Sequence, residues 1–171
     1  MNKLEKVLYI IFFIALTIFF IKFFLLVLLI VLLLGFLRTW QMQQEPNNKA
    51  FLNGALPNPT PDGFYQGDVG FNTSWLGKKF DAENSTGINV FKNKRGVQIE
   101  KYPFKTYAGR GLADQQLFVL KIDYNVTGNP FWLRPVLDEI VQIAPNEYLG
   151  KMHARIIPDF PFSFLYFQLK K

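Results

Sequence analysis

The sequence predicts one transmembrane helix followed by an all-β domain of about eight antiparallel strands, which curl into a barrel or a sandwich. Two observations carry this prediction. Residues 8–37 form a long and nearly uninterrupted apolar run, whereas residues 63–171 are a series of short alternating or apolar stretches separated by turn signals. Almost no helical periodicity follows the apolar run, which favours strands for the second part.

The apolar run is typical of a retained membrane anchor. Within residues 8–37, only Thr17 and Lys22 are appreciably polar, and the run is well above the roughly 20 residues that a bilayer core requires. It ends without the small-residue site at which a signal peptide is cleaved. We therefore expect residues 1–40 to form a single-pass anchor helix in an integral membrane protein.

Lys22 lies near the middle of this run, and two explanations for it stay open. The thirty residues would rise about 45 Å as a helix, against a hydrocarbon core of about 30 Å, so surplus turns must tilt, protrude or pack against another protein. An unpaired ammonium at that depth is costly. Lys22 either snorkels to an interface or meets a carboxylate or carbonyl group of a partner subunit.

Charge gives a weak indication of orientation and excludes one class of partner. Lys3 and Lys6 precede the apolar run and Arg38 and Lys49 follow it, which is nearly balanced. The short N-terminal tail is typical of a signal anchor, so we expect the C-terminal domain on the non-cytoplasmic side. After Gln41 there are 15 basic and 12 acidic residues, and this small excess fits contact with membrane lipid and argues against nucleic acid as a partner.

A polar, proline-punctuated stretch separates the anchor from the β-domain. Residues 41–62 lack apolar periodicity, and Pro57, Pro59 and Pro61 stand at alternate positions. We expect a Pro/Asn-rich linker with an extended, polyproline-like end. The β-domain then occupies residues 63–171.

Strand signals follow one another through the β-domain. In residues 118–124, for example, apolar side chains alternate with Lys121 and Asp123. The last strand is apolar on both faces, so we expect the first strand to cover it and close the sheet. The expected strands are 64–71, 78–81, 87–92, 97–107, 117–125, 137–143, 148–156 and 163–169.

The inventory of chemically competent side chains is thin, so we expect neither a catalytic nor a metal site. Cysteine is absent, and the single histidine, His153, is expected to be a surface or hydrogen-bonded core residue, with axial ligation of a haem as the alternative. Asp138 and Glu139 are adjacent in a strand and must point to opposite faces. We expect one to pair with Lys151 or Arg155, and the one inside the barrel to recognise a polar ligand head if it is unpaired.

Aromatic residues make up 17% of the chain. They predict either an ordinary aromatic core or a barrel whose interior or mouth accepts an apolar molecule. Aromatic side chains in predicted loops indicate contact with lipid headgroups or a partner protein. The candidates for the pocket are Trp75, Phe80, Asp138 and Glu139, and those for partner or membrane contact are Lys22, Trp40, Phe131, Trp132, Phe160 and Phe162.

Several short motifs resemble small uncharacterised β-domains named for a Gly-x-Trp-x-Gly motif. Residues 74–80, Ser-Trp-Leu-Gly-Lys-Lys-Phe, resemble the motif itself, with Thr73 at the place of its first glycine. Residues 137–143, 148–152 and 162–167 resemble the closing strands of those domains. By wider analogy the domain is similar to lipocalin-type barrels, and this resemblance implies an eight-stranded barrel and an apolar ligand.

Two functions are expected from these features. The first is an accessory or structural subunit of a larger membrane complex, held by the helix and capped at the surface by the β-domain. The second is a membrane-tethered, lipocalin-like module that binds a lipid, a pigment or another apolar molecule. No cofactor is expected apart from such a bound lipid or pigment, and no enzymatic activity.

Overall fold

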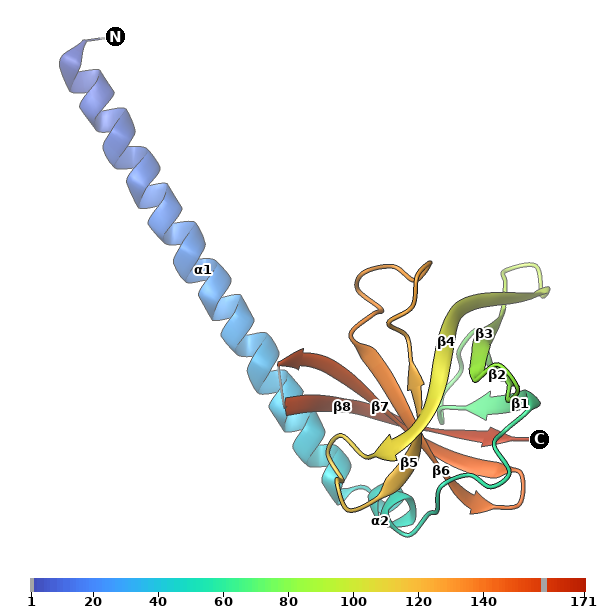
Figure 1. Ribbon diagram of the computed structural model, residues 1–171. Helices are drawn as coiled ribbons and strands as arrows, with labels where there is room; N and C mark the ends of the chain where they lie inside the picture. The colour runs from blue at the N-terminus through green and yellow to red at the C-terminus, as the bar shows by residue number, and fades with distance from the viewer. Residues whose placement is uncertain (1, 158–159) are drawn as a thin grey trace. The chain divides into compact units, whose positions relative to one another are not determined.

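The computed structural model describes residues 2–157 and 160–171. The chain divides into two compact units, with the boundary between Leu37 and Arg38. The first unit is a single stretch of helix, and the second contains a β-barrel with the helical segments packed on it (Figure 1). The predicted combination of one long apolar helix and an eight-stranded antiparallel barrel is therefore confirmed.

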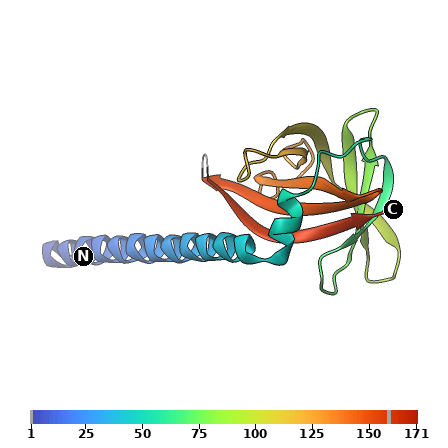
Figure 2. The same cartoon turned by 90° about the horizontal axis from the view of Figure 1, so that it is seen from below.

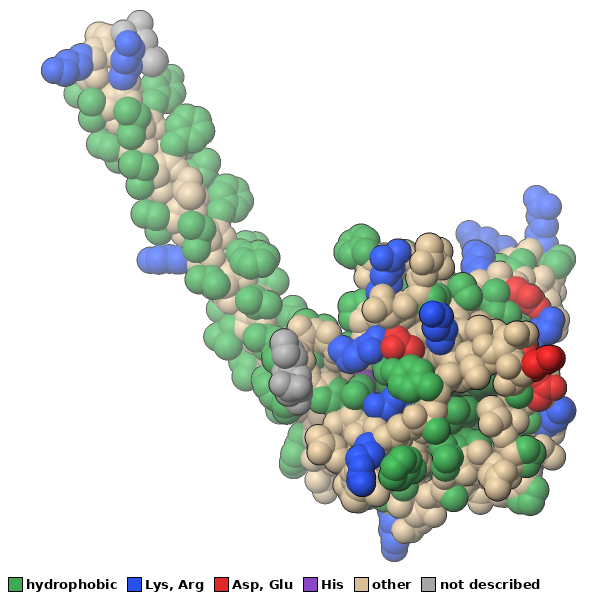
Figure 3. Space-filling view, viewed as in Figure 1, with side chains coloured by type: hydrophobic (Ala, Val, Ile, Leu, Met, Phe, Trp, Pro, Cys, Tyr) green, Lys and Arg blue, Asp and Glu red, His purple; other side chains and the backbone are tan. Residues whose placement is uncertain are grey.

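Helix α1 (Lys3–Gln44) contains the apolar run, and in the described residues it is the one helix long and apolar enough to cross a membrane. Its start is fixed by a reciprocal capping box, in which Asn2 Oδ1 accepts the Glu5 N–H and the Glu5 carboxylate accepts the Asn2 N–H, both at 2.8 Å. Hydrophobic side chains cover α1 on the visible face (Figure 3). Lys22 is exposed on it, and the Thr17 hydroxyl donates a hydrogen bond to the Phe13 carbonyl oxygen.

The second unit is an up-and-down barrel in which each strand pairs antiparallel with the next in sequence (Figures 1 and 2). The first and last strands pair through Gly67 and Leu169, so the predicted closure is confirmed. The strands are β1 (Gly63–Asp68), β2 (Trp75–Asp81), β3 (Thr86–Lys92), β4 (Gln98–Arg110), β5 (Phe118–Asp123), β6 (Val136–Ala144), β7 (Glu147–Ile157) and β8 (Phe160–Lys170).

The prediction of a Pro/Asn-rich linker at residues 41–62 is wrong for its first part, which is helical. Helix α1 continues to Gln44, and α2 (Pro46–Leu52) begins directly after it, with proline in the first turn, where its missing N–H is harmless. Met42 and Phe51 are fully buried against the outer face of the barrel, beside Val141. These two buried apolar side chains hold a segment whose largely polar composition otherwise indicates a linker.

One end of the barrel interior is solid. Inward-facing side chains of successive strands pack there, with Tyr65 against Phe80 and Tyr148, and Phe104 against Phe80 and Tyr124. The ring centroids of these pairs lie 5.2–5.8 Å apart in edge-to-face arrangements. An ordinary aromatic core therefore fills this end.

Candidate ligand cavity and a buried polar network

The opposite end of the barrel contains a cavity of about 390 Å³. The β1–β2 and β5–β6 connections contribute to its lining together with the adjoining strands. Most of the exposed wall is apolar, and a small group of polar side chains lies among the rings. The aromatic residues that line it are Phe71, Trp75, Phe91, Tyr102, Tyr124, Trp132 and Phe167.

Lys78 of β2 is the centre of the polar group in this cavity. The strand alternation that turns Phe80 into the core turns Lys78 inward as well, and its side chain is 3% exposed. Its ammonium donates to Asn89 Oδ1 at 3.0 Å, to Asp138 Oδ2 at 2.9 Å and to the Tyr124 hydroxyl. An ammonium has three donors, so all of them are satisfied.

Four aromatic rings surround the same ammonium. Its nitrogen lies 5.1–5.5 Å from the ring centroids of Trp75, Phe104, Tyr124 and Phe167, within the range of cation–π attraction. Complete burial lowers the pKa of Lys78 from its usual value, while the attraction of the Asp138 carboxylate opposes that shift. The cage therefore holds a cation supplied by the protein itself.

The neighbours of Lys78 are cross-linked in turn. The Tyr124 hydroxyl donates to Asp138 Oδ2 at 3.0 Å, and Trp75 Nε1 donates to Asn89 Oδ1 at 3.1 Å. Burial, followed by the adjacent Asp138 charge, raises the pKa of Tyr124 well above its usual value, so the phenol keeps its proton. One atom is left over, because the buried Asp138 Oδ1 has no hydrogen-bond partner in the described structure.

Two of the four predicted pocket residues line this cavity. Trp75 and Asp138 do so, and Asp138 is paired with Lys78, not with Lys151 or Arg155. Phe80 belongs to the solid core at the other end of the barrel.

The placement of Glu139 in the pocket is wrong. As the alternation of β6 requires, its side chain lies on the outer face, opposite to that of Asp138. Lys78, Asn89 and Tyr124 were missed as cavity residues. Counting in steps of two from the inward-facing Phe80 is the signal that could have identified Lys78.

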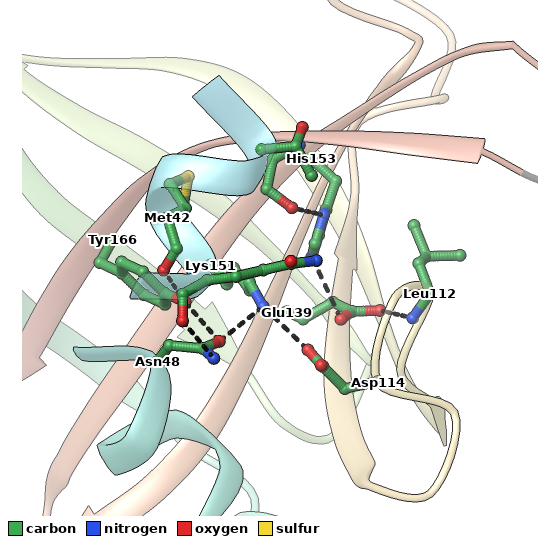
Figure 4. A network of polar contacts seen from close by, with 11 residues as sticks. Met42, Asn48, Leu112, Asp114, Glu139, Lys151, His153 and Tyr166 are labelled. Atoms are coloured by element: carbon green, nitrogen blue, oxygen red, sulfur yellow. Dashed lines mark hydrogen bonds and ion pairs between the residues drawn. The ribbon is translucent and has the colours of Figure 1, made fainter. Parts of the chain in front are cut away.

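Glu139 forms part of a second buried network, beneath the helical segments on the outer face of β6, β7 and β8 (Figure 4). Glu139 Oε1 accepts the Leu112 N–H at 2.7 Å, and Oε2 lies 3.3 Å from His153 Nε2, which is an ion-pair distance without hydrogen-bond geometry. His153 Nδ1 lies 3.1 Å from Ser163 Oγ. His153 is thus a hydrogen-bonded core residue, as one reading of the sequence expected.

The order of groups in this chain resembles that of a Ser-His-acid triad, but its burial points to a different use. Ser163, His153 and Glu139 are all at most 1% exposed, and the backbone N–H of Ser163 donates to Thr39 Oγ1 at 3.0 Å. A serine oxygen that attacks a substrate has to reach a surface or a cavity. These three side chains instead connect β6, β7 and β8 with the end of α1 and with the loop at Leu112.

Lys151 extends the outer network toward α2. Its ammonium donates to Asp114 Oδ2 at 2.9 Å and to Asn48 Oδ1 at 3.3 Å, and it lies 5.2 Å from the Phe51 ring centroid (Figure 4). Tyr166 donates to the same Asn48 oxygen at 2.9 Å. One buried lysine therefore connects β7 with α2 and with the loop that follows β4.

We expect Lys151→Met to loosen α2 and the β4–β5 loop from the barrel. The variant removes the partner of Asp114 and should lower the free energy of unfolding by about 2–3 kcal/mol, less than for a fully enclosed pair because Asp114 can regain water. Hydrogen exchange should accelerate at the amides of α2 that follow Pro46 while the β2–β3 ladder stays protected. Unchanged exchange in α2 would contradict this role.

The predicted contact residues divide into exposed and buried groups. Phe131, Trp132 and Trp40 are 83%, 56% and 60% exposed, and Trp132 also stands at the cavity wall, 6.0 Å from the Tyr102 ring. The placement of Phe160 and Phe162 in a loop is wrong, since both belong to β8. Phe162 is 2% exposed, so it packs inside the domain and presents no surface to a partner.

No group of three or more histidine, cysteine or carboxylate side chains that could hold a metal ion occurs among residues 2–157 and 160–171. The polar groups that line the cavity include an ammonium, a carboxylate, an amide, two phenols and the Thr73 hydroxyl. This set can orient a ligand through hydrogen bonds, and the surrounding rings can pack against an apolar body.

Comparisons with known proteins support the fold. No protein-family model matches the chain, and no curated protein matches its sequence. A crystal structure of a protein from Thermomonospora curvata is similar, with a TM-score of 0.51 over 72% of this chain and 84% of that chain. The two sequences are 17% identical, so the likeness shows a shared fold and carries no function with it.

Proposed function

We propose that the protein is a membrane-tethered binding module whose barrel holds a small apolar molecule, such as a lipid or a pigment. The observation that carries this proposal is the aromatic cavity of about 390 Å³ at one end of a barrel whose other end is solid. Pockets of this size with apolar walls and a few convergent polar groups are typical of small-molecule sites. The apolar length of α1 favours a tether in the bilayer, where such molecules dissolve.

The exposed aromatic residues at the cavity mouth support the same function. Phe71 and Trp132 both line the cavity and are more than half exposed, and Phe131 is adjacent to Trp132. Large exposed rings around an apolar opening favour contact with a lipid surface or with an apolar molecule on its way in. The apolar molecule would then enter the cavity between these exposed rings.

A matched pair of valine substitutions tests the cavity. Val69 lines the cavity and Val97 is 57% exposed in the β3–β4 turn, so Val69→Trp fills the site and Val97→Trp makes the same change outside it. We expect organic extracts of the purified full chain and of Val97→Trp to contain the same small molecule in near-stoichiometric amount by mass spectrometry, and Val69→Trp to lose most of it. Equal amounts in all three, or none in any, would contradict the proposal.

A second candidate function, an accessory subunit of a membrane complex, is favoured by Lys22. Its ammonium is exposed on an apolar helix, with hydrophobic side chains on both sides along the sequence. A carboxylate or carbonyl group of another membrane subunit would satisfy it, and snorkelling to an interface is the alternative.

We expect Lys22→Leu to release a partner held in this way. Complexes purified in a mild detergent should lose the co-purifying subunit with Lys22→Leu and keep it with Lys6→Leu, which removes a lysine before the apolar run. Migration of the unsubstituted chain as a free monomer would argue against the accessory role and leave the binding module unaffected.

A further inference from the structure

We infer that the cavity selects a neutral apolar molecule whose head is a hydrogen-bond donor, such as a long-chain alcohol, and discriminates against a fatty acid carboxylate. This inference rests on the proposed binding function and names the ligand class. A buried lysine in an apolar barrel suggests at first a site for an anionic head. The hydrogen bonds around Lys78 argue against an anionic head.

Lys78 has no donor left for a ligand. Its three N–H groups are directed to Asn89, Tyr124 and Asp138, and its positive charge is balanced by the Asp138 carboxylate at 2.9 Å. The rings that surround it are likewise occupied by this internal cation, so the cage is not open to a quaternary ammonium ligand. An anionic head would have to displace Asp138 to reach the ammonium.

The group that is left without a partner is an acceptor. Asp138 lines the cavity, its side chain is 5% exposed, and its Oδ1 has no hydrogen-bond partner in the part of the chain that the structure describes. Its other oxygen, Oδ2, already accepts from Lys78 and Tyr124. A buried carboxylate oxygen without a donor is unfavourable, and a ligand hydroxyl or N–H would remove that cost.

Charge balance narrows the ligand further. The Lys78–Asp138 pair is neutral as a whole and lies in an apolar wall. A carboxylate head would add an unpaired negative charge beside Asp138, and an alkylammonium head would add a positive charge beside Lys78. Moving either charged head out of water costs far more than moving a hydroxyl. A neutral donor satisfies Oδ1 without altering the charge of the site.

The three tryptophans of the chain provide a direct readout. Trp75 and Trp132 line the cavity, and Trp40 is exposed on α1, so a Trp40→Phe background leaves only cavity reporters. The full chain in phosphatidylcholine nanodiscs is titrated with dodecanol, dodecyl methyl ether, dodecanoate and dodecylamine, at a pH where the last two are charged. Empty nanodiscs correct for partition into the lipid.

We expect dodecanol to bind about tenfold or more tightly than the ether and the two charged ligands, because it alone brings a donor without a charge. Asp138→Asn should reduce the preference for dodecanol over dodecanoate at least about tenfold, whereas Glu100→Gln, a charge change on the barrel surface, should keep it. If Asp138→Asn does not fold, the relative affinities of the four ligands for the unsubstituted protein still test the inferred ligand class.

Dodecanoate or the ether binding as tightly as dodecanol would overturn the inference and leave the binding function intact. If none of the four ligands changes the tryptophan emission, the proposed function fails with it. The two failures are therefore separate results of one titration.

Discussion

Replacing Lys78 with methionine should lower the free energy of unfolding of the barrel by about 3–5 kcal/mol, because it leaves the Asp138 carboxylate buried without its counter-charge. The lost interactions include three hydrogen bonds and the attraction of four rings. Urea unfolding of the full chain in micelles, followed by tryptophan emission, measures the change. The transition should shift to lower urea without losing its cooperativity.

Two companion variants identify the cause. Lys79→Met removes the next lysine, which forms an ion pair with Glu100 and has a side chain that is more than half exposed. This variant should lower the free energy of unfolding by less than about 1 kcal/mol. Lys78→Met combined with Asp138→Leu removes both buried charges and should recover much of the lost stability. A double variant as unstable as Lys78→Met alone would show that packing, not the unpaired charge, causes the loss.

Among substitutions that add one methyl group to a glycine of the barrel, Gly77→Ala should lower the stability most. Gly77 has φ +142°, and a Cβ there would lie 2.0 Å from the Tyr65 carbonyl oxygen and 2.8 Å from the Gly67 nitrogen. Both neighbours are backbone atoms of the paired strand β1, so neither can rotate away. We expect a loss of about 3–5 kcal/mol or failure to fold, measured by the same urea transition.

Gly70→Ala is the matched control for backbone strain. Gly70 also has positive φ, at +79°, but its Cβ would meet nothing within 4 Å. Its substitution should therefore cost only about 1 kcal/mol from the backbone conformation. Equal losses at Gly70 and Gly77 would show that conformation alone, and not the close approach of β1, requires the glycine at position 77.

The regular parts of the fold could be predicted because their patterns are local. Alternation in residues 118–124 identifies β5, and the doubly apolar last strand predicts its pairing with β1. The packing of Met42 and Phe51 could not be predicted, because the few apolar side chains of this largely polar stretch form no period. Their burial depends on the outer face of β6 and β7, which lies far away in sequence.

Only some residues of the candidate site could be predicted, because the others depend on contacts between distant strands. Trp75 is an aromatic residue and Asp138 follows from the alternation of β6, so both could be identified. Lys78 was missed because a lysine beside Lys79 in a strand resembles a solvent-facing pair, although its position two residues before the inward-facing Phe80 indicates the barrel interior. Whether the barrel is solid or hollow depends on how side chains from eight strands meet.

The closure between β1 and β8 has a consequence for biosynthesis. Every other pairing joins neighbours in sequence, whereas Gly67 meets Leu169 across almost the whole domain. During translation, β1 must therefore wait with an unpaired edge until β8 leaves the ribosome, and loop closure of this length is slow. Exposed edges recruit other strands in the meantime. Nascent chains stalled before β8 should for this reason be the species most prone to aggregation and most dependent on chaperones.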